Sequence, residues 1–444
     1  MFDRRTLLVG AGTMAVASRA AAAPPAGALD AAHFGVHGGA PDDQSERLQR
    51  AVAEAARRRL PLWLAPGLYR CGGLTLPTGA QLVGSRGATR LALTHGPSLI
   101  AAAHAEAIAL DGLVFEEGDV RPPERRDLLH FDAATNLRVS DCEFQHAGGN
   151  AVSLARCAGE IVRCRIEDAG DNAIFAIDSA GLVIAGNTIR GSGNGGIRVF
   201  QSDKRYDGTL VADNRIEETH ARAGGSGENG NAINVFRAQN VIVRNNVIRA
   251  AAFSAIRGNA ASNIQIIGNN CTALDEVAIY SEFDFEGAVI ADNVIDEAGS
   301  GISIANFREG GRLAVVHGNL VRNLHSRIAG QDPESEGYGI GVEADTVVSG
   351  NVIENAETAG IAAGWGEYLR NVVVDGNVVR RSGIGVAVSV ARGAGIAAIT
   401  GNIFAELRRG AVIGMEYRKA VTGDLVLAGA ERYPQLRIAG NQID

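Results

Sequence analysis

Gly186-Asn187-Thr188-Ile189 is the first clear copy of a four-residue pattern, Gly-Asn-x-Ile/Val, that recurs along this 444-residue chain. Gly or Asp precedes the Asn in most copies, and an aliphatic residue follows two places later in nearly all. The asparagines of these copies are Asn187, Asn214, Asn246, Asn269, Asn293, Asn319, Asn351, Asn377, Asn402 and Asn441. Successive copies are 23 to 39 residues apart, and an internal repeat of this length is typical of a solenoid.

A second pattern, Gly/Ala-Ile-x-Val, lies between the copies of the first, as at residues 196–199, 232–235, 301–304 and 339–342. Each repeat therefore holds at least two short segments of alternating apolar residues, which is the period of a half-buried strand. No repeat has room for a ten-residue helical pattern. The sequence predicts an all-β fold, a right-handed parallel β-helix. A leucine-rich repeat is the alternative, but the apolar positions are mainly Ile and Val and the Leu-x-x-Leu-x-Leu spacing is missing.

The repeated asparagines have a structural explanation. Asn tolerates the left-handed backbone region that a sharp turn between strands requires. Its amide can also bond to the same amide one turn of the solenoid away, at roughly 4.8 Å. We therefore expect these asparagines to build the fold rather than to bind a ligand. Cys142 and Cys164 occupy the Asn position in two earlier copies, where buried free thiols are favoured over a disulfide.

The first 23 residues are predicted to be a targeting segment. Arg4 and Arg5, followed by Leu7-Leu8, resemble a twin-arginine signal, and the run Ala20–Ala23 offers small-residue cleavage sites. Cleavage removes three arginines and one aspartate, so the net charge moves from -8 to about -10, which disfavours binding to nucleic acid. We expect a periplasmic or secreted protein that uses the twin-arginine export machinery and has no stable membrane insertion, since no stretch approaches 18 apolar residues.

Residues 30–93 form a predicted N-terminal cap with the first turns, and residues 94–444 form the repeats. Asp42-Asp43-Gln44-Ser45 can cap a helix from about Glu46 to Arg59. This helix, residues 33–39 (His-Phe-Gly-Val-His-Gly-Gly) and Leu64-x-Pro66-Gly67-x-Tyr69 resemble the N-terminal cap of pectate-lyase-like and tailspike-like β-helix proteins. In that superfamily the helix plugs the open end of the coil, so the resemblance implies capping carboxylates rather than catalytic ones.

Signal, cap and repeats together resemble a family of twin-arginine-translocated bacterial repeat proteins whose repeat has been described as cofactor-binding. The resemblance implies the fold and export, but no established reaction, and it leaves the cofactor unknown. The five cysteines form no Cys-x-x-Cys pair, so no metal site is predicted from them.

Two related insertions depart from the repeat. Each follows a His-x-Arg sequence that begins six residues after a repeat Asn, and each is an acidic loop that leads into an Ile-x-Val strand. A histidine titrates near neutrality, and a nearby carboxylate can act as an acid or base. The predicted catalytic residues are His220, His325, Glu228 and Glu336, and the arginines predicted to neutralise an anionic substrate are Arg222 and Arg327. The alternative is purely structural, with loops sealed by His–Glu or Arg–Glu bonds.

A second group of residues lies in or just after the Ile-x-Val strands, where stacking would place them along one face. Aromatic rings can pack on sugar faces, and arginines can bind uronate groups. The predicted substrate-binding members are Arg198, Arg257, Tyr280, Glu282, Glu343 and Trp365. The alternative is an ordinary solvated face on which aromatic side chains seal loop edges.

Two functional hypotheses follow. The recognised catalytic patterns of β-helix enzymes are mostly absent, with no Asp-Asp pair or Gly-His-Gly in the repeats. The first hypothesis is a lyase or hydrolase of acidic polysaccharide that uses the histidines as general bases. The second is a non-catalytic protein that binds a glycan or a cofactor along the same face. The sequence leaves enzymatic activity open.

Overall fold

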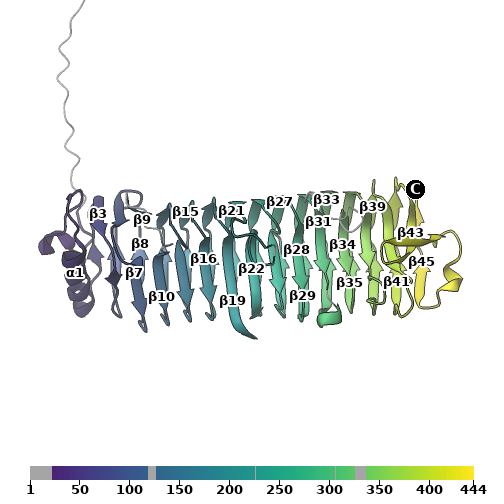
Figure 1. The fold of residues 1–444 in the computed structure, drawn as a ribbon, viewed down its shortest axis with the longest axis horizontal. Coiled ribbons are helices and arrows are strands. Elements are labelled where there is room, and N and C mark those ends of the chain that lie inside the picture. Colours follow the sequence, from purple (N-terminus) through teal and green to yellow (C-terminus); the bar gives the residue numbers. More distant parts are fainter. Residues whose placement is uncertain (1–22, 119–126, 226, 306, 326–336) are drawn as a thin grey trace, which may run out of the picture.

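The computed structural model describes residues 23–118, 127–225, 227–305, 307–325 and 337–444. In these residues the chain winds into a long rod whose wall consists of three β-sheets (Figure 1). Sheet A has 16 strands, from β1 (Leu29–Asp30) to β45 (Leu436–Ala439). Sheet B has 15 strands, from β3 (Gly67–Cys71) to β46 (Gln442–Ile443). The predicted parallel β-helix is confirmed, and the leucine-rich alternative is wrong.

Sheet C carries the candidate site. Its 15 strands are parallel except for the last pair, β43 and β44, which is antiparallel. The strands are β4 (Leu74–Thr75), β7 (Ser98–Ala103), β10 (Asp127–Asp132), β13 (Val152–Ala155), β16 (Asn172–Ile177), β19 (Gly195–Tyr206), β22 (Asn231–Gln239), β25 (Ile256–Asn259), β28 (Val277–Glu282), β31 (Ser300–Ile304), β34 (Tyr338–Val342), β37 (Ala359–Ala363), β40 (Ile384–Ser389), β43 (Gly410–Glu416) and β44 (Lys419–Asp424).

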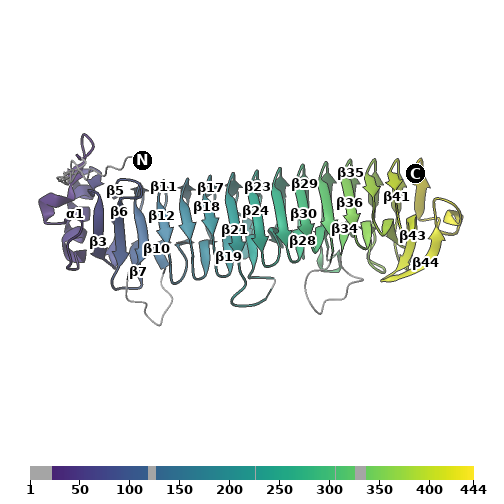
Figure 2. The same ribbon diagram turned by 90° about the horizontal axis from the view of Figure 1, so that it is seen from above.

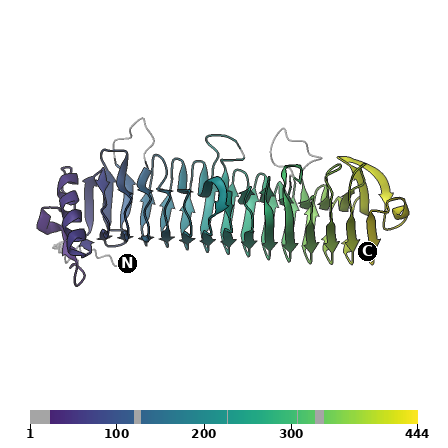
Figure 3. The same ribbon diagram turned by 90° about the horizontal axis from the view of Figure 1, so that it is seen from below.

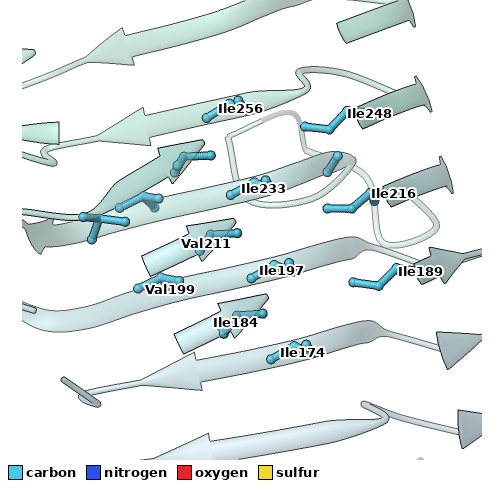
Figure 4. Close-up of a cluster of buried hydrophobic side chains, with 14 of the residues drawn as sticks. Ile174, Ile184, Ile189, Ile197, Val199, Val211, Ile216, Ile233, Ile248 and Ile256 are labelled. Atoms are coloured by element: carbon cyan, nitrogen blue, oxygen red, sulfur yellow. The ribbon is translucent and has the colours of Figure 1, made fainter. Parts of the chain in front are cut away.

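The core is built from stacked aliphatic side chains, each directly above its equivalent in the next turn (Figure 4). In sheet C, Ile197 pairs with Ile233, which pairs with Ile256, and all three are fully buried. Burying one such side chain contributes about 1.5–3 kcal/mol. In the Gly/Ala-Ile-x-Val pattern, Ile and Val thus face the core while the residue between them faces outward, which fixes the register of the whole sheet.

The repeated asparagines form a buried hydrogen-bonded ladder, as expected. The side-chain Nδ2 of Asn293 donates to Oδ1 of Asn319 at 3.0 Å and to the backbone oxygen of Ile266 at 2.9 Å. The left-handed conformation, however, falls on the residue before the ladder position, such as Asp292 (φ 57°) or Gly318 (φ 66°). The expectation that Asn itself takes this conformation is wrong, because the Asn side chain must point inward along the ladder.

Cys142 and Cys164 extend this ladder towards the N-terminus. The backbone N–H of Cys164 donates to Oδ1 of Asn187 at 2.9 Å, so the thiol takes the place of an amide. All five cysteines are buried and free. Burial raises the pKa of the Cys142 thiol well above its ordinary value.

The predicted capping helix is confirmed as α1 (Ser45–Arg58), which lies across the N-terminal end of the rod (Figure 1). The Asp43 side chain accepts a hydrogen bond from the Ser45 backbone N–H at 2.9 Å, and Asp42 pairs with Arg47. Leu48 and Val52 on the inner face of α1 are fully buried. Residues 1–22 of the predicted signal lie outside the described residues. In the part of the chain that is described, no helix combines the length and apolarity needed to cross a membrane.

Candidate functional site

The outer face of sheet C carries a continuous row of side chains at the position between Ile and Val. Strand pairing places Arg198 beside Asn234, Asn234 beside Arg257, and Arg257 beside Tyr280. The next positions in the row are small, namely Ser303, Gly341 and Ala362. We call the outer face between Arg257 and Ala362 the site floor. Glu282 lies beside Asn259 on the same face, two positions after Tyr280.

Arg257 is the centre of a buried ionic network on this floor. Its Nε and Nη2 donate to the two carboxylate oxygens of Glu282 at 2.7 and 2.9 Å, and its Nη1 donates to Glu276 at 3.2 Å. Burial, the largest single influence, disfavours the charge, but the hydrogen bonds to Glu282 together with the negative charges of Glu282 and Glu276 outweigh it and raise the pKa of the Arg257 guanidinium. The guanidinium carbon lies 4.8 Å from the centre of the Tyr280 ring. Arg257 therefore holds Glu282 and Tyr280 in place.

The loop between β21 (Arg215–Thr219) and β22, described at residues 220–225 and 227–230, lies over Arg198 and Asn234, just before the floor in the outward row, and projects from the rod (Figures 2 and 3). Arg198 is only 4% exposed beneath it and donates to Oδ1 of Asn229 at 2.6 Å. The carboxylate of Glu228 approaches Nη1 of Arg198 at 3.5 Å. The Asn234 amide donates to the Gly227 and Glu228 carbonyl oxygens, both at 3.1 Å. The contact between Arg198 and Glu228 is an Arg–Glu bond of the kind expected if the insertion has only a structural role.

The predicted catalytic residues are not gathered around one point in the described structure. His220 and His325 are both exposed, and each follows a strand of sheet B, β21 and β33 (Leu320–Leu324), which are four strand positions apart. Within the described residues, the side chains of His220 and Arg222 form no hydrogen bond or ion pair. Glu228 lies against Arg198 instead of His220. Arg327 and Glu336 lie outside the described residues.

A pocket of about 230 Å³ opens at the C-terminal end of the floor. Its lining includes three of the predicted binding residues, Tyr280, Glu343 and Trp365. Trp365 is 38% exposed, and its ring meets the ring of Tyr417 edge-on at 5.6 Å. A carboxylate oxygen of Glu343 accepts the Phe307 backbone N–H at 2.6 Å. The structure thus separates the six predicted binding residues into a pocket group and an Arg257–Glu282 pair, with Arg198 beneath the loop.

Four residues that contact the floor, the pocket or Arg198 were not predicted from the sequence: Glu276, Asn229, Tyr338 and Arg418. Glu276 and Asn229 come from turns that precede the strands, and Arg418 comes from the turn of the antiparallel hairpin β43–β44. None of the four is part of a repeated pattern, so their roles could not be predicted from periodicity. Tyr338 alone lies next to such a pattern, two residues before Ile340, and could have been found from that position. Among the described residues, no three His, Cys, Asp or Glu side chains gather as a metal-ion site requires.

Comparisons with known proteins concern the fold. The family model described as "Right handed beta helix region" matches residues 127–228 and 205–404. No curated protein matches the sequence significantly.

Three solved structures illustrate the likeness. The tailspike protein of E. coli bacteriophage HK620, solved with a pentasaccharide, has a TM-score of 0.52 at 12% identity, over 85% of this chain and 76% of that one. Bacteriophage phi29 gene product 12 has a TM-score of 0.50 at 14% identity, over 87% of this chain, which spans 55% of that protein. The A-module of an Azotobacter vinelandii mannuronan C-5 epimerase has a TM-score of 0.44 at 15% identity, over 94% and 99% of the two chains.

The TM-scores of the tailspike protein and of gene product 12 show a likeness of fold and nothing about the reaction. The family match covers more than half of the sequence, and the described strands form three sheets that are parallel apart from the β43–β44 pair. This chain belongs to the right-handed β-helix family.

Proposed function

We propose that this protein binds a carbohydrate on the outer face of sheet C. The observation that carries the proposal is the pocket at the end of the site floor, where Tyr280, Tyr338 and Trp365 lie together with Glu343. Ligand sites typically combine aromatic and apolar walls with a few fixed polar groups. Aromatic faces suit the apolar faces of sugar rings, and a fixed carboxylate accepts hydrogen bonds from their hydroxyl groups.

The comparison with the HK620 tailspike agrees with this proposal, since that protein has the same architecture and was solved with a pentasaccharide. The described geometry favours binding over turnover. A general base must be placed within hydrogen-bond reach of the proton that it removes, and it is usually oriented by a partner. His220 is exposed and its side chain has no such partner among the described residues.

The test is a glycan-binding screen of the purified chain, repeated with Trp365→Ala. We expect the wild type to bind one class of glycan and Trp365→Ala to lose most of that binding, because the ring forms one wall of the pocket. Tyr206→Ala is the matched control, because Tyr206 is 66% exposed on β19 and does not line the pocket. Equal binding by wild type and Trp365→Ala would contradict the proposal.

Turnover is tested on the same samples by measuring new reducing ends and unsaturated products. We expect none. Product formation that disappears in His220→Ala or His325→Ala, with folding intact, would instead support the lyase or hydrolase hypothesis.

We also propose that the chain is exported by the twin-arginine pathway, on the basis of Arg4, Arg5 and the alanine-rich segment that follows. Replacing both arginines by lysine should retain the protein in the cytoplasm, as measured by fractionation. Unchanged export would contradict this proposal. Intact mass measurement of the exported protein would also reveal any bound cofactor as a reproducible extra mass.

A further inference from the structure

The pocket exists because the outward row of sheet C changes from large to small side chains. Arg257 and Tyr280 are followed by Ser303, Gly341 and Ala362 in consecutive strands. Adjacent strands lie about 4.8 Å apart, so three small positions leave a short hollow rather than a long groove. Its volume of about 230 Å³ is below the roughly 300–1,000 Å³ of pockets that enclose drug-sized ligands. The space suits one sugar ring.

The aromatic walls of the pocket are already fixed by the protein. The Arg257 guanidinium packs over the Tyr280 ring at 4.8 Å. Tyr338 lies directly on Gly341, where an added Cβ would come within 2.8 Å of the tyrosine ring. Trp365 is held between Gly364 and Gly366, both with positive φ, and packs edge-on against Tyr417. Walls that need no ordering on binding lose little entropy when a ligand enters.

The charges in and around the pocket favour an uncharged ligand. The arginine of the floor, Arg257, already donates to the carboxylates of the buried Glu282 and the half-buried Glu276. Glu343 adds a carboxylate to the pocket lining, where it is fixed by the Phe307 N–H. With the guanidinium of Arg418 counted, the described lining has no net formal charge and so offers no net positive charge to a uronate group, whereas sugar hydroxyls can donate to the Glu343 carboxylate. Arg418 is the one basic side chain among the described lining residues, and it lies at the exposed rim over Trp365.

The β43–β44 hairpin closes the C-terminal end of the floor, next to the pocket. The outward row continues beyond Ala362 with Ala387 and Ile413, which are only 9% and 5% exposed. Both belong to a small apolar cluster against which Met415 and Ala420 of the β43–β44 hairpin pack. The hairpin, visible at the C-terminal end of the rod in Figure 2, therefore covers the sheet where a longer ligand would have to continue.

We propose that this pocket is a closed subsite for a single uncharged sugar ring at the end of a glycan chain, with the rest of the chain leaving the pocket on the side away from the β43–β44 hairpin. The inference rests on the proposed function and specifies its ligand. It differs from the acidic polysaccharide expected from the sequence.

The test is titration of the full-length protein and two variants with glucose and galactose oligosaccharides and with oligogalacturonates of the same lengths. Ala362→Leu fills the hollow without removing an aromatic or charged group. Ala398→Leu is its matched control, because Ala398 faces outward at a comparable depth on strand β41 (Ala397–Thr400) of sheet A. We expect the wild type and Ala398→Leu to bind a neutral oligosaccharide with little salt dependence. Ala362→Leu should weaken binding at least about tenfold.

Preference for a chain end is measured by using a neutral polymer, intact or cut into shorter chains, to displace the bound oligosaccharide at equal mass of sugar. The cut polymer should displace the oligosaccharide in proportion to its number of ends. Equal displacement by cut and uncut polymer would overturn end recognition. Preferred, salt-sensitive binding of oligogalacturonates, or unchanged binding by Ala362→Leu, would overturn the neutral subsite while leaving carbohydrate binding intact. A wild type that binds no member of either series, but keeps its thermal unfolding transition, would overturn both proposals.

Discussion

At the scale of single residues, the asparagine ladder is the feature whose energetic role is most sharply defined. Asn293 is fully buried, donates to Asn319 and Ile266, and accepts from both the backbone and the side chain of Asn269. Asn293→Ala leaves several buried groups unpaired, each of which costs about 1–3 kcal/mol. We therefore expect a loss of at least about 3 kcal/mol in the free energy of unfolding, measured by denaturant titration.

Asn441→Ala is the control for this prediction, because Asn441 is half-buried at the C-terminal end of the same ladder. Asn441→Ala should lower the free energy of unfolding clearly less than Asn293→Ala does. Equal effects of the two changes, or a loss below about 1 kcal/mol for Asn293→Ala, would mean that the ladder contributes little beyond ordinary hydrogen bonds.

The sequence predicted this ladder because each Asn recurs at the period of one turn, whereas single-residue contacts with no period were not predictable. The assignment of Arg257 to a substrate illustrates the limit. Its partners Glu282 and Glu276 lie 25 and 19 residues away, and only the strand register brings them together. Sequence spacing cannot distinguish an arginine that waits for a ligand from one already paired within the protein.

At the scale of elements, the loop between β21 and β22 covers Arg198 and Asn234, which precede the site floor in the outward row of sheet C. Two adjacent residues of this loop should differ in their contribution to stability. Glu228 is 68% exposed and only 3.5 Å from Arg198, a type of pair that contributes roughly 0–1 kcal/mol. Asn229 accepts a 2.6 Å hydrogen bond from the buried Arg198, which is worth about 1.5–3 kcal/mol. Denaturant unfolding should show Asn229→Ala to be the more destabilising change.

Glu228→Gln should leave the unfolding midpoint almost unchanged, since it retains an acceptor near Arg198. The reverse order of the two effects would show that Glu228, and not Asn229, holds the loop over Arg198. The sequence predicted that an acidic loop stands here, but not what it covers, because the loop lacks the repeat that fixes the strands.

At the scale of the whole molecule, the rod needs its N-terminal end closed. An uncovered turn of a β-helix exposes its apolar interior and its strand edges, which promotes association. Val52 faces the first turn from α1 and is 1% exposed, whereas the adjacent Ala53 faces solvent. Val52→Asp should lower the thermal unfolding temperature and produce soluble aggregates detectable by light scattering, while Ala53→Asp should do neither. Identical behaviour of the two variants would show that α1 does not protect the core.

The fold was almost wholly predictable from the sequence, because a strand pattern that is ambiguous in one repeat is supported by the same pattern in the others. Ten copies of one pattern specify the turns, and the alternation of Ile and Val specifies which side chains face inward. The pocket was not predictable in the same way. It depends on a hairpin at residues 410–424 that departs from the repeat and folds over the last turns of sheet C.

Carbohydrate binding in the pocket is best tested by a crystal structure of the protein with a neutral oligosaccharide selected from the binding screen. One sugar ring is expected in the pocket between Tyr280 and Trp365, with the next rings leaving it on the side away from the β43–β44 hairpin. A sugar bound elsewhere would contradict this expectation, above all one in the groove of about 440 Å³ on sheet A, which is lined by Val289, Val315 and Val347.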